Sequence, residues 1–219
     1  MNGMVSQEVQ ALGVRDRVVT SLGRVLQVSG HLTDDRAREH LKHGLARRLC
    51  LLHLGIAEIV AIAHPRGREL LSDVEQLNLA LHLNSFYLHI RGCLGNLAWC
   101  LAHELKQFGS QIEEERVASK VNLLAGSFLG TLTSAAPGLA VSVRRHTEWH
   151  RDLKSIRDPA GQLSDELNGI GDYMPSFAHS PSVAVNLRKV YPQVGGDLLI
   201  VLELLEDVVI YLEQRDRVV

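Results

Sequence analysis

Histidines are the residues whose type and spacing most directly suggest chemistry, and the chain has 11 of them. His146 and His150 form an H-x-x-x-H pair, which places two imidazoles on one helix face, where they can bind a transition metal. The metalloprotease signature needs Glu directly after the first His, but Thr147 stands there. Because no Cys and no second H-x-x-x-H pair lies nearby in sequence, a hydrogen-bonded core histidine is the better interpretation. We therefore predict no metal and no other cofactor.

A second set of histidines lies along one long helix. His82, His89 and His103 share a line with Asn96 at multiples of seven residues. Seven residues are about 10.5 Å of helix rise, which is too far for neighbours to share one metal ion. A polar helix face is the preferred interpretation of this line.

Cationic side chains continue the line of the H-x-x-x-H pair. Lys154 and Arg157 follow His150 at steps of 4 and 3 residues, and Arg151 flanks them. A cationic ridge beside a Gly/Pro-rich loop can contact the phosphates of RNA or of a nucleotide. The alternative is a solvated helix face with ion pairs between residues four apart.

Composition limits the remaining function classes. A net charge of −2 argues against a protein that binds polyanions over its whole surface. Cys50, Cys93 and Cys100 show no C-x-x-C spacing and are interpreted as reduced, buried thiols. The most apolar stretches, 49–63 and 198–212, are shorter than the ~20 residues of a bilayer span. The N-terminus does not resemble a signal peptide, so we expect a cytoplasmic protein with no membrane partner.

The longest of the helices that must position these side chains is predicted over residues 72–108. Its apolar residues follow one another at steps of 3 and 4, and Ser72 with Glu75 forms a capping-box pattern. Gly92 and Gly95 lie inside this helix and each costs up to ~1 kcal/mol relative to Ala. We therefore expect another helix to pack closely against both glycines.

The same periodicity predicts other helices over residues 1–32, 33–64, 137–157 and 197–213. Thr33 and Asp197 are the expected N-caps, and Pro137 suits a first helical turn. Residues 110–136 are expected to form a connector with one short helix, and residues 159–195 a long irregular loop. The sequence thus predicts an all-α fold with one domain, 1–219, a single up-and-down-like bundle of five or six mostly long amphipathic helices.

Two stretches, LNSFYLHIRGCLGNLAW (83–99) and EWHRDLKSIRDPAGQ (148–162) followed by YMPSF (173–177), form a recognisable pair. They resemble bacterial helical-bundle proteins related to the HEPN superfamily. That group typically shows a helix reading R-G-x-L-D-N-L-A-W, then W-x-x-x-L, R-D, A-H and a turn with Tyr and Pro. The resemblance covers residue 72 to the C-terminus and implies a helical bundle, often dimeric.

Active HEPN proteins cut RNA without a metal, using an R-x-x-x-x-H pair at the end of a helix. The resemblance assigns the phosphate-binding Arg to Arg157 and the following residue to Asp158. Gln162 takes the position of the His, and its amide cannot act as a general acid or base. Gly95 departs from the usual Asp. His150, on the same helix face as Arg157, is the candidate substitute for the proton carrier.

Three functions follow from these observations. The leading hypothesis is a HEPN-like, non-catalytic module that binds RNA or a nucleotide or acts in regulation. The first alternative is a metal-independent endoribonuclease that uses Arg157, and the second is a structural protein that forms a homodimer. The candidate binding residues are Arg157, Asp158, Lys154, Arg151, Arg91 and Asn96.

Overall fold

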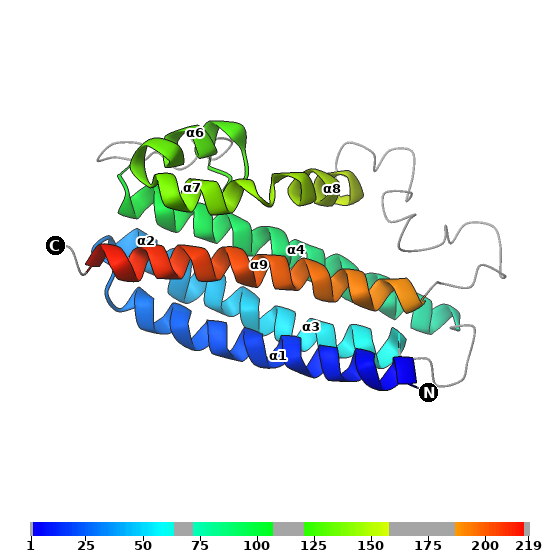
Figure 1. Cartoon of the computed structure of the whole chain (residues 1–219). Coiled ribbons are helices and arrows are strands. Elements are labelled where there is room, and N and C mark those ends of the chain that lie inside the picture. The colour runs from blue at the N-terminus through cyan, green and yellow to red at the C-terminus, as the bar shows by residue number, and fades with distance from the viewer. Residues whose placement is uncertain (1, 64–71, 107–120, 158–186, 217–219) are drawn as a thin grey trace.

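The computed structural model describes residues 2–63, 72–106, 121–157 and 187–216, and every regular element in these ranges is a helix (Figure 1). The all-α prediction is therefore confirmed for the described part of the chain. None of the helices in these ranges has the length and apolar character that crossing a bilayer requires.

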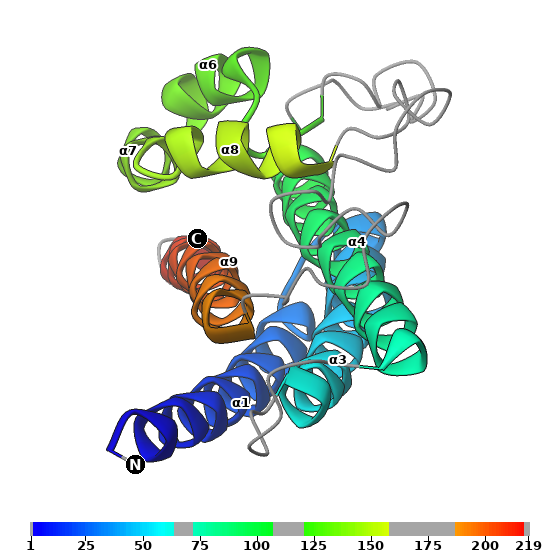
Figure 2. The ribbon, with the colours of Figure 1, turned by 90° about the vertical axis from the view of Figure 1, so that its right-hand side faces the viewer.

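The long helices in the described ranges are α1 (Asn2–Ser29), α3 (Ala46–Ala63), α4 (Asp73–Glu104) and α9 (Leu187–Asp216). α3 packs along α1 and α4, and α9 packs along α1, α3 and α4 (Figures 1 and 2). α1, α4 and α9 run in one direction and α3 in the other (Figure 1). The predicted up-and-down alternation therefore ends after α4, because the chain passes through a second group of helices before it returns as α9.

This second group consists of the shorter helices α6 (Gly126–Ala135), α7 (Pro137–Arg144) and α8 (Thr147–Arg157). Figure 2 shows them on one side of the long helices, above α4 and α9. α6 packs on α7, and α7 packs on α9. The group thus forms a second layer rather than further long members of one bundle.

One prediction for this layer needs correction. Pro137 does open a helix, but the single helix predicted over 137–157 is wrong, since Arg145 and His146 form a turn between α7 and α8. His146 consequently lies outside α8, and the predicted ridge does not follow one continuous helix. The described part of the connector predicted over 110–136 contains the one short helix expected there, α6, which has 10 residues.

The N-terminal helix ends at Ser29, and the chain then forms one continuous helical run. This run consists of α2 (Asp35–Glu39), η1 (His40–Leu45) and α3. η1 is a π-helix, in which each backbone N–H reaches the carbonyl five residues earlier; the N–H of Ala46 accordingly bonds to the carbonyl of Leu41. Such turns recur at functional sites.

The start of this run differs from the prediction by one residue. Asp34, not Thr33, is the N-cap, and its carboxylate accepts hydrogen bonds from the backbone N–H groups of Arg36 and Ala37. Thr33 instead bonds to a side chain from α4. α3 extends to Ala63, and the predicted end at His64 lies outside the described residues.

α4 begins as predicted. Ser72 accepts a hydrogen bond from the N–H of Glu75, whose carboxylate accepts one from the N–H of Ser72. Gly92 faces the Arg48 side chain of α3, and a Cβ atom there would overlap the guanidinium. A Cβ atom on Gly95 would meet nothing within 4 Å, so the close packing predicted at Gly95 is wrong.

α9 begins ten residues earlier than predicted, at Leu187. Asp197 is therefore not an N-cap but a buried residue inside the helix. Residues 187–195, predicted as part of a long loop, are helical. The rest of that predicted loop lies outside the described residues.

The core consists mainly of aliphatic side chains, and all four long helices contribute to it. Among the largest fully buried side chains are Leu41, Leu45, Leu49, Leu52, Ile56, Leu79, Leu83, Phe86 and Ile90. Cys93 and Cys100 lie in this core, and burial raises the pKa of the Cys93 thiol to about 12. Cys50 is exposed, which corrects the prediction that all three thiols are buried.

Candidate ligand-binding site at helix η1

The residues predicted to bind a ligand are distributed over two helices. Arg151 is exposed on α8, where His150 is half-buried. Asp158 lies outside the described residues, as do the side chains of Lys154 and Arg157. Arg91 is exposed on α4. Asn96, five residues further along α4, projects from a different face of that helix.

Asn96 is the predicted residue around which the structure gathers other polar groups. Its side-chain amide donates a hydrogen bond to the carbonyl of Gly92 at 2.8 Å. Its carbonyl oxygen Oδ1 lies 3.2 Å from Nδ1 of His40, which comes from η1. Because Oδ1 only accepts, Nδ1 of His40 carries the proton in this contact.

Three rings stack next to this hydrogen bond. The ring centroids of His40 and Trp99 are 5.8 Å apart and their planes differ by 9°. His103 lies 5.6 Å from each of the other two rings, at 18° and 27°. His103 is buried, whereas His40 and Trp99 are half-buried. The stack therefore leaves part of two rings open to solvent.

Arg48 continues the polar line toward the start of α4. Its Nη1 lies 3.4 Å from Nδ1 of His89. Burial and, to a smaller extent, the charge of Arg48 lower the pKa of His89. A neutral His89 can accept a hydrogen bond from the guanidinium. The side chains of His40, Arg48, His89, Asn96, Trp99 and His103 are called the η1 site below.

Small residues allow α4 to approach η1 and α3 at this site. A Cβ atom on Gly44 would overlap the amide of Asn96, and one on Gly92 would overlap the guanidinium of Arg48. His40, Gly44 and Arg48 succeed one another at steps of four residues, so they lie on one side of their helical run. The π-turn at 40–45 is where this side meets the α4 line of His89, Asn96 and His103.

Exposed cationic residues lie in the same helical run as His40. Lys42 and His43 in η1 and Arg47 in α3 are exposed. Glu39 is the only acidic residue between positions 36 and 48, and the Arg and Lys residues of that stretch are Arg36, Arg38, Lys42, Arg47 and Arg48. In a chain of net charge −2, the stretch 36–48 that carries His40 and Arg48 is thus itself positively charged.

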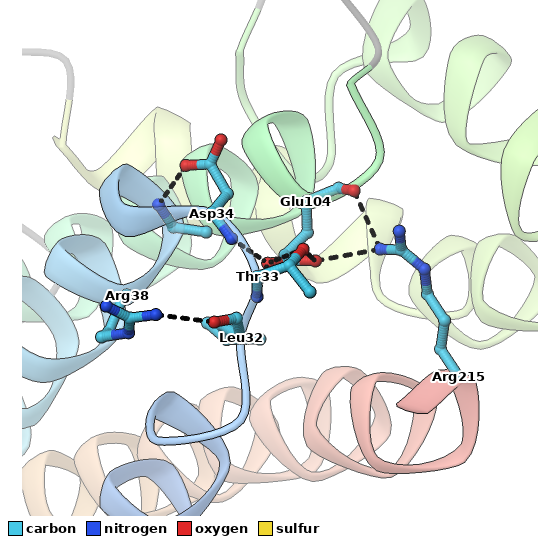
Figure 3. Close-up of polar contacts among 7 residues, drawn as sticks. Leu32, Thr33, Asp34, Arg38, Glu104 and Arg215 are labelled. Atoms are coloured by element: carbon cyan, nitrogen blue, oxygen red, sulfur yellow. Dashed lines mark hydrogen bonds and ion pairs between the residues drawn. The ribbon is translucent and has the colours of Figure 1, made fainter. Parts of the chain in front are cut away.

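Glu104, the last residue of α4, fixes α2 beside the site (Figure 3). Its buried carboxylate accepts hydrogen bonds from the backbone N–H groups of Thr33 at 2.8 Å and Asp34 at 2.9 Å. Arg215 of α9 donates to this carboxylate at 3.1 Å and to the carbonyl of Glu104 at 2.8 Å. One buried carboxylate therefore joins three elements and holds the helical run that carries His40.

A second buried carboxylate, Asp197, fixes α8 to the long helices. It accepts hydrogen bonds from Tyr87 Oη of α4 and Trp149 Nε1 of α8, both at 2.9 Å, and from Gln193 Nε2 at 3.0 Å. Burial raises the pKa of Asp197, and these hydrogen bonds act in the opposite direction. Asp197 thereby positions the first turns of the predicted cationic helix.

Two of the three histidines of the η1 site, His40 and His103, take part in the ring stack, and the third, His89, contacts Arg48. Within the described residues, no group of three or more His, Cys, Asp or Glu side chains is arranged to hold a metal ion.

The partners from η1 and α3 are the part of the site that sequence reasoning missed. The α4 line of His89, Asn96 and His103 was visible as a seven-residue repeat, but His40 contacts Asn96 across 56 positions of sequence. The step of four that links His40, Gly44 and Arg48 was the available signal.

Neither a family model nor a curated protein matches this chain, and no solved structure matches it. Function is therefore inferred from the η1 site and its surroundings. Two properties of the site bear on chemistry: a partly accessible ring stack, and exposed cations within a few residues of it.

Proposed function

We propose that this protein is a HEPN-like, non-catalytic module that binds single-stranded RNA or a nucleotide at the η1 site. The observation that carries the proposal is the half-buried Trp99 ring stacked on His40, whose helical run also carries the exposed Lys42 and Arg47. Proteins bind unpaired bases by stacking them on aromatic side chains and bind the phosphates with Lys and Arg. Trp99 offers the stacking surface, and Lys42 and Arg47 offer the charge.

The HEPN resemblance supports the same location. In the stretch RGCLGNLAW (91–99), Gly92 accommodates Arg48, Asn96 bonds to His40, and Trp99 stacks on His40. Three residues of the motif, Gly92, Asn96 and Trp99, therefore contribute to one site. The proposal includes a cytoplasmic location, because RNA and nucleotides are ligands of that compartment. It also includes a single domain over residues 1–219.

Binding of a fluorescently labelled, single-stranded RNA tests the proposal. The double variant Lys42→Glu with Arg47→Glu should weaken binding at least tenfold, with a smaller difference at high salt, because phosphate contacts release counterions. Arg17→Glu, which changes an exposed cation on α1, is the matched control and should bind like the wild type. Equal affinity of all three proteins would contradict the proposal.

The same RNA reports on the endoribonuclease alternative. We expect the wild-type protein in EDTA to leave the RNA intact, since Gln162 stands where active family members have His. Cleavage that is abolished by Arg157→Ala would instead establish the catalytic function.

A further inference from the structure

Arg48 contributes a half-buried cation to the η1 site. Within the described ranges, no acidic side chain forms an ion pair with it. Arg24 and Arg215 also reach from one helix to another, and each of them binds a carboxylate on the helix that it reaches. A guanidinium that is partly removed from water and has no carboxylate partner is suited to bind an anionic group of a ligand.

Gly92 and His89 of α4 set the position of this guanidinium. It lies over Gly92, where a Cβ atom would come within 2.2 Å of its central carbon Cζ. Its Nη1 lies 3.4 Å from Nδ1 of His89. Burial and the charge of Arg48 lower the pKa of His89, which favours the neutral imidazole. When Nδ1 accepts from Arg48, the proton of that imidazole is on Nε2, which can then donate to a ligand.

The remaining nitrogens of Arg48 and His89 are accessible. Neither side chain has a nitrogen that is both fully buried and without a hydrogen-bond partner. A similar contact joins α1 and α3, where Nη2 of Arg15 lies 3.2 Å from Nε2 of His53. There, Nε of Arg15 and Nδ1 of His53 are fully buried. The Arg15 contact is therefore enclosed, whereas Arg48 and His89 can donate to a group that approaches from solvent.

We propose that Arg48 and His89 form a phosphate subsite of the η1 site, and that the ligand is a single-stranded oligonucleotide lying along α4 from Trp99 toward His89. This inference rests on the proposed function, in which a base stacks on Trp99. The guanidinium lies over Gly92, which is seven residues from Trp99, or about 10.5 Å of helix rise. A chain that stacks one base on Trp99 can therefore place the phosphate of a neighbouring nucleotide on Arg48.

The charge of the subsite matches a phosphodiester. Arg48 supplies one positive charge, and neutral His89 supplies a donor without a second charge. A phosphodiester carries one negative charge and two unesterified oxygens, which can accept from the guanidinium fork and from Nε2 of His89. The phosphate monoester of a free nucleotide carries a charge of about −1.5 to −2 at neutral pH, which one guanidinium does not neutralise. The subsite therefore favours a linkage within a chain over a free nucleotide.

A trinucleotide and its analogue with uncharged methylphosphonate linkages test the subsite. Trp99 fluorescence in a Trp149→Phe background reports binding of both. Arg48→Gln should weaken binding of the natural trinucleotide about tenfold and change binding of the analogue less than about twofold, because the analogue lacks the charge that Arg48 binds. Arg15→Gln removes the enclosed contact with His53 and is the matched control, which should bind the natural trinucleotide like the wild type.

Two further variants keep a cation and change its geometry. Arg48→Lys loses the planar fork, and Gly92→Ala displaces the guanidinium, so each should weaken binding of the natural trinucleotide but not of the analogue.

The possible failures are distinguishable. Equal effects of Arg48→Gln on both ligands, or wild-type affinity of this variant for the natural trinucleotide, would overturn the subsite and leave the stacking site at Trp99. Adenosine 5′-monophosphate that binds the wild type as tightly as the trinucleotide would overturn the assignment of an oligonucleotide ligand. If neither trinucleotide changes the Trp99 fluorescence, the proposed function fails and this inference fails with it.

Discussion

His40 stacks on Trp99 with ring centroids 5.8 Å apart and planes inclined by 9°. The contact joins η1, the π-helix that precedes α3, to the last turns of α4. It depends on the hydrogen bond from His40 to Asn96, which fixes the orientation of the imidazole. The η1 site is therefore organised before any ligand binds, and substitutions that disturb its frame should affect both stability and binding.

Asn96→Ala should uncouple His40 from α4. Loss of one partly buried hydrogen bond should lower the free energy of unfolding by about 1 kcal/mol. RNA affinity should fall as well, because the stacked imidazole loses its orientation. Urea denaturation and fluorescence anisotropy measure the two effects. Asn78→Ala, at an exposed position of α4, should change neither quantity.

Two glycines near the η1 site, Gly44 and Gly95, should respond in opposite directions to substitution by Ala. A Cβ on Gly44 overlaps the amide of Asn96, so Gly44→Ala should destabilise the protein by about 1–3 kcal/mol. Gly95 has open space around it, so Gly95→Ala should stabilise α4 by roughly 0.5–1 kcal/mol. Thermal unfolding distinguishes them. A lower Tm for Gly95→Ala would show that the helix packs more closely there than described.

Glu104→Ala should destabilise the protein strongly. The substitution leaves the N–H groups of Thr33 and Asp34 without their acceptor and Arg215 without its ion pair. Since these groups are only partly buried and each lost hydrogen bond costs about 1 kcal/mol, the total loss should be roughly 2–4 kcal/mol in urea denaturation. Glu203→Ala, at an exposed position of α9, is the control. A loss no larger than that of the control would contradict the role assigned to Glu104.

Asp197 should make stability depend on pH. Burial raises its pKa above the ordinary 3.8, so the folded protein binds this proton more tightly than the unfolded chain. The contribution of Asp197 to stability is therefore greatest at low pH and decreases as pH rises from 3.8 through the raised folded pKa. Asp197→Asn should remove this dependence, while Asp197→Ala should destabilise at every pH. Urea denaturation over a pH series gives the comparison.

The sequence predicted those features of the fold that depend on neighbouring residues, and it did not predict those that depend on contacts between distant segments. The capping box at Ser72 and Glu75 is four residues long, and the structure contains it as predicted. Asp197 was misassigned because Gly195 and Gly196 suggest a helix end, whereas the contacts that hold Asp197 come from Tyr87 and Trp149. Those contacts arise from tertiary packing, which the local pattern does not contain.

In the candidate site, too, the local pattern was predicted and the contacts between helices were not. Asn96 was predicted as a binding residue from α4 alone, but His40 and Arg48 reach α4 only through the packing of α3. The turn at Arg145 and His146 also escaped prediction, since the apolar spacing continues across it. Periodicity therefore located helices and faces, and packing determined which faces meet.

The fluorescence of Trp99 tests the central claim most directly. The chain has two tryptophans, so Trp149→Phe leaves Trp99 as the only one. Titration of this variant with a short single-stranded RNA should quench the emission, because a base stacks on the ring. The quenching should follow the same binding curve as the anisotropy of the labelled RNA. RNA binding that leaves the Trp99 emission unchanged, or no binding at all, would contradict a ligand site at η1.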